Sequence, residues 1–132
     1  MASVKLDIPI AAPAAHVWDA VSDIGAIHTR FVPGFVTDTK LDGDMRTVTF
    51  ETGFVARELI VDLDPAAMRL AYAVQPNELM THHHATFEVV PEGPAACRLV
   101  WQADFLPAEA EAPVRGMMEQ GAAVMKRTLG GK

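Results

Sequence analysis

The chain has 132 residues, half of them apolar and about a fifth charged, which is typical of a globular protein that buries a core of its own. The formal net charge of -6 and the scattering of the eleven Lys and Arg residues argue against nucleic-acid binding. A single cysteine excludes an internal disulfide, and we find neither a secretory signal nor an apolar run long enough to span a membrane. We therefore expect a cytoplasmic protein without membrane insertion.

The N-terminal segment predicts one strand and two short helices. Val4, Leu6 and Ile8 alternate with polar residues, which is the pattern of a strand with one buried face. The stretch APAAHVWDAVSD then changes to helical spacing, and Pro13 suits the start of a helix. A second short helix or turn is expected in IGAIHTRFVPG, where the Pro-Gly pair ends it.

The middle of the chain predicts six further strands. Short links rich in Gly, Pro, Asn and Asp separate them, and no link contains a helix. Because such links join neighbouring antiparallel strands, we expect a meander. The predicted strands are residues 35–41, 46–51, 55–63, 68–74, 81–90 and 97–105.

The C-terminal segment, from residue 107 onward, predicts a long amphipathic helix that ends at Gly130 and Gly131. It is the only predicted element long enough to cover the apolar face of a seven-stranded sheet. The sequence thus predicts an α+β fold, in which a curved antiparallel sheet of seven strands wraps around this helix and two short helices follow the first strand. Without repeats or a linker, residues 1–132 are expected to form a single domain. The apolar face of the helix comprises Val114, Met117, Met118, Gly121, Met125 and Leu129.

This order of elements resembles the helix-grip fold of the START and polyketide cyclase-dehydrase superfamily, also called SRPBCC. The resemblance covers nearly the whole chain and is carried by APAAHVWDAVSDIGAIH, LDPAAMRLAY and CRLVWQADFLP. It implies a cavity between the sheet and the terminal helix. It also implies one of two functions, namely binding of a hydrophobic ligand or cofactor-independent cyclase, dehydratase or aromatase chemistry.

Three consecutive histidines lie in one predicted strand. Neighbouring side chains of a strand point to opposite faces, so His83 should point inward with Phe87, and His82 and His84 outward. An H-x-H pair could hold a metal ion, but only Asp104 is expected beside it, and a zinc site needs at least a third protein ligand. We therefore favour an exposed pair without a metal.

His83 is the first candidate for chemistry. A ring among Phe87, Trp101 and Tyr72 should be partly desolvated, which lowers its pKa and keeps the imidazole neutral. We predict that Tyr72 could be its hydrogen-bond partner, so that His83 acts as a general base with Tyr72 as proton donor, or orients a ligand. The alternative is a core histidine satisfied by Tyr72 or by a backbone carbonyl.

Arg57 and Glu58 lie in VARELIVDL, a strand whose two faces are both partly apolar. If Val55, Leu59 and the alternate residues after them face inward, Arg57 does too, whereas a bulge would bring Glu58 inward instead. The resemblance favours Glu58, because related sequences often have a glutamate here. The alternative is that both charges lie on the solvent face.

The Met and Gly face of the last helix suggests a ligand cavity, because Met117 and Met125 adapt to irregular shapes and Gly121 removes side-chain volume. Ordinary packing of the helix on the sheet is the alternative. If the resemblance holds, His28 lies near the mouth of the cavity and could contact a ligand. A solvated histidine at a helix end is the other interpretation.

Together these features predict a protein that binds a small apolar or aromatic molecule, such as a lipid, isoprenoid or polyketide. The alternative is a cofactor-independent polyketide cyclase, dehydratase or aromatase that uses His83, Tyr72 and Glu58 for acid-base chemistry. A third hypothesis is an interaction domain whose interior is filled by side chains. We expect no cofactor, no metal and no nucleic acid, and a monomer or homodimer. The predicted ligand contacts are Trp101, Phe87, Met117, Gly121, Met125, His28 and Arg57.

Overall fold

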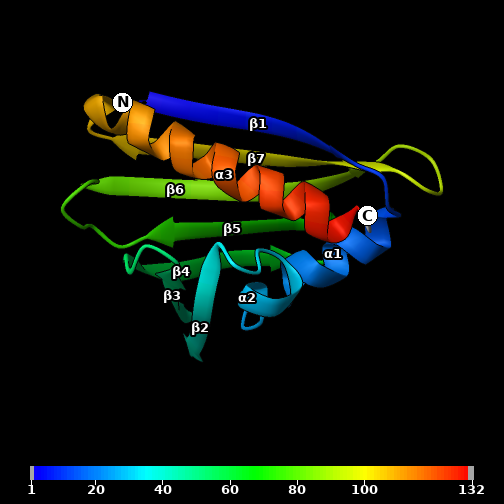
Figure 1. Ribbon diagram of the computed structural model, residues 1–132, viewed down its shortest axis with the longest axis horizontal. Helices are drawn as coiled ribbons and strands as arrows, with labels where there is room; N and C mark the ends of the chain where they lie inside the picture. The colour runs from blue at the N-terminus through cyan, green and yellow to red at the C-terminus, as the bar shows by residue number, and fades with distance from the viewer. Residues whose placement is uncertain (1, 131–132) are drawn as a thin grey trace.

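The computed structural model describes residues 2–130, and its seven strands form one curved antiparallel sheet (Figure 1). The order is β1-β7-β6-β5-β4-β3-β2, so the first strand pairs with the last and the others follow as a meander. This is the predicted sheet. The strands are β1 (Ala2–Ile10), β2 (Val36–Asp42), β3 (Met45–Phe50), β4 (Val55–Asp64), β5 (Arg69–Val74), β6 (His82–Pro91) and β7 (Cys97–Leu106).

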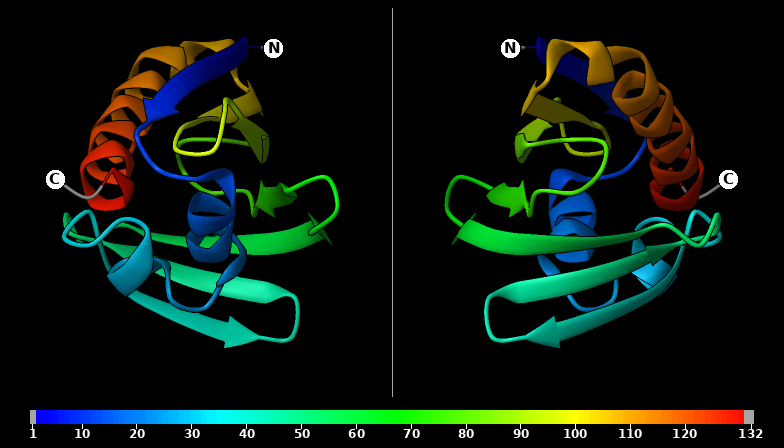
Figure 2. Two further views of the ribbon diagram at one scale, coloured as in Figure 1. Left: turned by 90° about the vertical axis from the view of Figure 1, so that its right-hand side faces the viewer. Right: turned by 90° about the vertical axis from the view of Figure 1, so that its left-hand side faces the viewer.

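Three α-helices and one 3-10 turn complete the described chain. Helix α1 (Ala14–Ser22) follows Pro13, α2 (Ile27–Arg30) is a single turn, and the 3-10 turn Ala108–Ala110 leads into α3 (Glu111–Leu129). Figure 2 shows that the sheet curls and that α3 lies along its inner side. Helix α3 ends before Gly130, as predicted, whereas Gly131 lies outside the described residues. No helix in this part of the chain is long and apolar enough to cross a membrane.

The core lies between the inner face of the sheet and the helices. The residues of β7 are buried at every second position, as the alternation of side chains along a strand requires. The predicted apolar face of α3 is buried as well, except for the half-buried Met117. Burial of these apolar side chains, worth about 25 cal/mol per Å² removed from water, holds α3 against the sheet.

Strand β4 shows which charged side chain points inward. Glu58 is buried, whereas Val55, Leu59 and Val61 are exposed on the outer face together with Arg57. The register that would bring Arg57 inward is therefore wrong, and so is its assignment as a ligand contact. The reason lies in the pairing, because Glu58 lies opposite Arg46 of β3, which also points inward and neutralises its charge.

Candidate functional site

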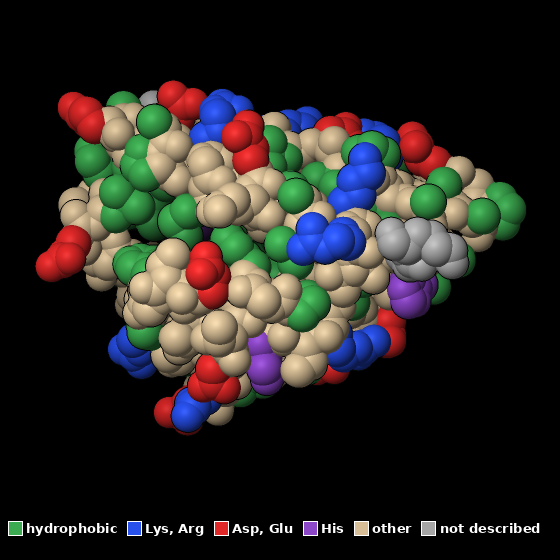
Figure 3. All heavy atoms as spheres, viewed as in Figure 1, with side chains coloured by type: hydrophobic (Ala, Val, Ile, Leu, Met, Phe, Trp, Pro, Cys, Tyr) green, Lys and Arg blue, Asp and Glu red, His purple; other side chains and the backbone are tan. Residues whose placement is uncertain are grey.

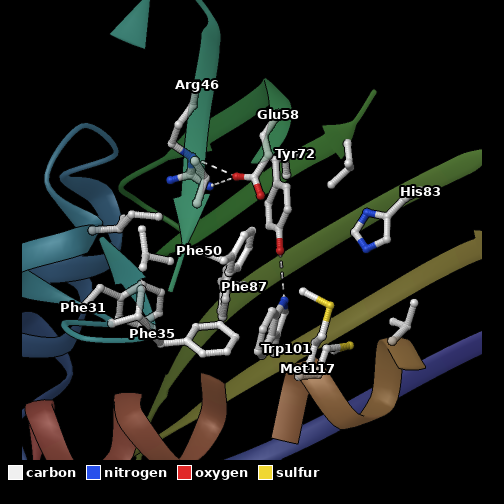
Figure 4. A pocket seen from close by; sticks show the side chains of 18 of the residues that line it. Phe31, Phe35, Arg46, Phe50, Glu58, Tyr72, His83, Phe87, Trp101 and Met117 are labelled. Atoms are coloured by element: carbon white, nitrogen blue, oxygen red, sulfur yellow. Dashed lines mark hydrogen bonds and ion pairs between the residues drawn. The ribbon is translucent and has the colours of Figure 1, made fainter. Parts of the chain in front are cut away.

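A cavity of about 100 Å³ lies between the inner face of the sheet, the segment around α2 and helix α3 (Figure 4). Its wall is mostly apolar and rich in aromatic rings and methionines. Arg46, Glu58, Tyr72, His83 and Trp101 are the residues of this wall that carry charged or hydrogen-bonding side chains. The aromatic residues of the wall, besides Tyr72, are Phe31, Phe35, Phe50, Phe54, Phe87 and Trp101.

The cavity meets the surface near the start of α3. Five residues line both the cavity and a second depression, and they come from the segment before β2, the end of β3 and the turn after it, the β5–β6 link and α3. Figure 3 shows apolar side chains gathered on the surface at this end of the molecule. A ligand would therefore pass between apolar side chains on its way in. The five residues are Phe35, Phe50, Phe54, Leu79 and Met117.

Phe87 is the centre of an aromatic wall. Its ring stacks on Trp101 with the ring centroids 4.8 Å apart, and it meets the edge of Phe31 at 5.2 Å. Tyr72 lies nearly parallel to Phe87 at 6.1 Å. Offset stacking and edge-to-face contacts are the arrangements that aromatic rings prefer, so this wall is preformed. Phe87 and Trp101 therefore lie where contact with a ligand was predicted, and the contact itself stays a prediction.

The hydroxyl group of Tyr72 accepts a hydrogen bond from Nε1 of Trp101 at 3.1 Å. Because the indole nitrogen can only donate, the proton of the Tyr72 hydroxyl stays free to donate elsewhere. Burial, followed by the negative charge of Glu58, raises the pKa of Tyr72, which keeps the phenol neutral. Tyr72 thus offers the cavity a hydrogen-bond donor.

His83 points into the cavity, as the strand alternation predicted, and only 8% of its surface is exposed. Its ring lies between those of Tyr72 and Phe105, at centroid distances of 6.1 and 6.4 Å. The predicted hydrogen bond between His83 and Tyr72 is not formed, although the Tyr72 hydroxyl, which accepts from Trp101, keeps its own proton free to donate. Within residues 2–130, Nδ1 of His83 is buried without any hydrogen-bond partner.

The environment of His83 keeps its imidazole neutral. Desolvation lowers its pKa to about 4, helped by His84 and His82, while its own backbone and Asp104 act in the opposite direction. A neutral imidazole carries one donor and one acceptor nitrogen. His83 could therefore bind a polar atom of a ligand or accept a proton from one.

The other two histidines of the run lie on the outer face of the sheet. His82 is exposed, and His84 is half-buried opposite Asp104 of β7, as the alternation predicted. In the described part of the chain, no cluster of three or more His, Cys, Asp or Glu residues could hold a metal ion. The outer pair therefore lies on the opposite face of the sheet from the cavity.

Sequence reasoning missed Arg46, the cationic residue of the cavity wall. Nε and Nη2 of Arg46 donate to Oε1 of Glu58 at 2.9 and 2.6 Å, and both side chains are almost fully buried (Figure 4). Nη1 donates to the carbonyl oxygen of Ile24 at 3.3 Å, and the guanidinium lies 5.5 Å from the centre of the Tyr72 ring. One signal was available, because Arg46 alternates in phase with the apolar Val48 and Phe50.

Comparisons with known proteins place the chain in a family. The sequence model described as polyketide cyclase / dehydrase and lipid transport matches residues 1–130. The chain belongs to this family. The predicted resemblance to the START and polyketide cyclase superfamily is thus confirmed. Among curated proteins, the comparison found no match.

Solved structures share the fold of this family member. A solution structure from Thermobifida fusca is 31% identical, with a TM-score of 0.80, and the match covers 98% of this chain and 91% of that one. The di-domain ARO/CYC protein BexL of the BE-7585A biosynthetic pathway is 17% identical, with a TM-score of 0.83 over 97% of this chain and 46% of that one. A START superfamily protein from Mycobacterium smegmatis is 17% identical, with a TM-score of 0.70 over 90% and 92% of the two chains.

Besides Arg57, two predicted ligand contacts of this family member do not lie in the cavity wall. Nδ1 of His28 is 3.0 Å from the hydroxyl oxygen of Thr39, so His28 ties α2 to β2 instead of reaching the cavity mouth. Gly121 is covered by aromatic rings, because a Cβ atom built on it would lie 3.2 Å from Phe35 and 3.3 Å from Trp101. Met117 and Met125 do line the cavity, together with Met118.

The packing at Gly121 leads to a testable expectation. Replacing Gly121 by Leu should lower the free energy of unfolding by about 1–3 kcal/mol, because the new side chain meets the rings of Phe35 and Trp101. Gly116 of the same helix has open space around it, so Gly116→Ala should raise stability by roughly 0.5–1 kcal/mol. Urea denaturation of both variants measures the contrast, and equal stability of Gly121→Leu and wild type would contradict the packing.

Proposed function

We propose that this protein binds a small apolar molecule with an aromatic ring in the cavity between the sheet and α3. The observation that carries the proposal is an interior wall of aromatic rings and methionines with a few polar groups directed into it. Ligand sites of proteins have this composition, in which the apolar wall supplies affinity and the polar groups fix orientation. The family to which the chain belongs is described by polyketide cyclase, dehydrase and lipid transport functions, which supports an apolar ligand.

The unpartnered ring nitrogen of His83 supports binding over a core filled by side chains. Buried polar atoms in proteins nearly always have a hydrogen-bond partner, because leaving one without a partner costs about 1–3 kcal/mol. Nδ1 of His83 has none in the described chain, although it lies beside the cavity. A polar atom of a bound molecule would satisfy it.

Filling the cavity tests the proposal. Ala56 of β4 lines the cavity, whereas Ala85 of β6 is buried on the same inner face outside the cavity wall. We expect Ala56→Leu to weaken binding of the fluorescent probe 2-naphthol by about tenfold or more, because the added atoms occupy the ligand's space, with little change in thermal stability. Ala85→Leu should instead lower stability by about 1–3 kcal/mol through overpacking.

Two results would contradict binding in the cavity. The first is an Ala56→Leu variant that binds 2-naphthol as tightly as wild type. The second is a protein purified from its own host that carries no small molecule in native mass spectrometry and gains no thermal stability from a panel of aromatic and lipid ligands.

One observation favours a second function, catalysis in the same cavity. The neutral imidazole of His83 has an unpartnered Nδ1, and the Tyr72 hydroxyl has a proton free to donate. A base and an acid at one apolar cavity are suited to the proton transfers of a cyclase or dehydratase, with Glu58 as a further acid-base group. For such an enzyme, His83→Phe lowers the rate by about 10²–10⁴-fold, whereas for a binding protein there is no turnover to lose.

A further inference from the structure

In the Arg46–Glu58 ion pair, the guanidinium nitrogens are all bonded within the protein, whereas one carboxylate oxygen is free to contact a ligand. All three nitrogens of the Arg46 guanidinium donate within the protein, two to Oε1 of Glu58 and one to the carbonyl of Ile24. The second carboxylate oxygen of Glu58, Oε2, receives no hydrogen bond from Arg46. Figure 4 shows this oxygen on the side away from Arg46, toward Tyr72. The pair therefore presents an acceptor to the cavity.

A carboxylate oxygen in an apolar cavity must be met by a donor. Ionised carboxylates only accept hydrogen bonds, and a buried one that lacks a donor is costly. We propose that Glu58, held in place by Arg46, selects ligands that carry a hydrogen-bond donor, such as a phenol, and disfavours ligands that carry a carboxylate. This inference rests on the proposed function, because it names the class of molecule that the same cavity takes.

Arg46 acts as a positioning residue. Its two hydrogen bonds to Oε1 of Glu58 hold that oxygen in place, and the Ile24 carbonyl and the face of the Tyr72 ring hold the guanidinium in turn. These contacts leave Glu58 with one committed oxygen and one oxygen for the ligand. A lysine could keep the charge but not this two-point contact, because its ammonium is a point charge on a flexible stem.

The same arrangement explains the discrimination against acids. Arg46 is the one Lys or Arg residue in the described cavity wall, and its guanidinium is bound to Glu58. The carboxylate of a fatty acid or an aromatic acid would be buried beside Glu58 without a counter-ion of its own, which is strongly unfavourable. A hydroxyl group on the same ring would instead donate to the free oxygen of Glu58.

A matched set of naphthalenes tests the inference at pH 7. The probes are naphthalene, 2-methoxynaphthalene, 2-naphthol and 2-naphthoic acid, with dissociation constants from fluorescence titration or calorimetry. We expect 2-naphthol to bind wild type about tenfold or more tightly than 2-methoxynaphthalene, because both have an acceptor oxygen and only the naphthol donates to a charged group. We expect 2-naphthoate to bind more weakly than naphthalene.

Two variants assign the selectivity to the ion pair. In the double variant Arg46→Met/Glu58→Leu, which removes both charges together, the ratio of naphthol to methoxynaphthalene affinity should fall to about one. In Arg46→Lys it should fall several-fold, because Glu58 keeps its charge but loses its fixed orientation. The readout is the ratio of two affinities measured with the same variant, so a change of the cavity that affects both probes equally does not alter it. Thermal melts show that each variant is folded.

The outcomes separate the inference from the proposed function. Equal binding of naphthalene, methoxynaphthalene and naphthol to wild type overturns the selectivity and leaves the proposed function standing. A naphthol preference that persists in the double variant also overturns it, because another acceptor, such as His83, would then be responsible. No binding of any of the probes overturns the proposed function and the inference with it.

Discussion

Replacing Arg46 by Met is expected to lower the free energy of unfolding by about 3–5 kcal/mol. The variant leaves the carboxylate of Glu58, only 6% exposed, in the interior without its counter-ion. The free energy needed to bury an unpaired charge is far larger than the stabilisation gained from packing the new methionine. Urea denaturation of wild type and variant at pH 7 measures the difference.

The double variant Arg46→Met/Glu58→Leu is the matched control. Removing both charges together leaves no unpaired ion, and apolar residues of similar size fill the space, so its stability should lie within about 1–2 kcal/mol of wild type. With the single variant Glu58→Leu measured as well, the double-mutant cycle gives a coupling energy of several kcal/mol between the two residues. A single Arg46→Met variant as stable as wild type would show that the ion pair does not contribute to the free energy of unfolding.

His83 should make the stability depend on pH between about pH 6.5 and pH 4. Its pKa falls from 6.5 to about 4 on folding, mainly through desolvation, so the unfolded chain binds more protons than the folded one in this window. The sign follows directly, because the stability contributed by the neutral ring is complete above pH 6.5 and is lost as the pH falls toward 4. The predicted loss is on the order of 3 kcal/mol, measured by urea denaturation at a series of pH values.

Two variants attribute this loss to His83. His83→Phe keeps an aromatic ring in the place between Tyr72 and Phe105 but cannot bind a proton, so the pH dependence should largely disappear. His82→Ala changes the exposed neighbour on the outer face and should keep the wild-type slope. A His83→Phe variant with an undiminished slope would assign the pH dependence to other groups.

Much of the fold could be predicted from the sequence, because alternation and turn residues are local signals. Each predicted strand is present, the two short helices follow β1, and the last helix covers the sheet. The alternation of side chains along β6 also predicted the orientation of the three histidines correctly, since one apolar residue such as Phe87 shows which face of the strand is buried. It was less informative for β4, where both faces carry apolar residues and Glu58 is buried.

The missed features of the site depend on non-local geometry. Burial of Arg46 depends on its position opposite Glu58, and that register between β3 and β4 is not contained in either strand alone. Arginine is almost never fully buried unless it is paired, so the alternation of Arg46 with Val48 and Phe50 was not enough by itself to place it inside. The pairing of Arg46 with Glu58 follows only from the register between β3 and β4.

The remaining differences between the predicted and the observed site come from how far large side chains extend. Trp101 extends across the sheet and donates to the Tyr72 hydroxyl, a contact that the sequence did not predict, and the predicted hydrogen bond between His83 and Tyr72 is not formed. The same large ring, with Phe35, occupies the space that Gly121 leaves free on α3. Spacing along the chain shows which face a residue shares, but not how far a ring on the opposite element reaches across the gap.

Methionine methyl groups provide the most direct test of ligand binding in the cavity. Met80, Met117, Met118 and Met125 line it, whereas Met45 lies on the outer face of β3 opposite Leu59. With ¹³C-labelled methionine methyls, titration with 2-naphthol should shift the resonances of the four cavity methionines through the ring current of the bound probe and leave Met45 in place. Shifts confined to Met45, or none at saturating probe, would contradict binding between the sheet and α3.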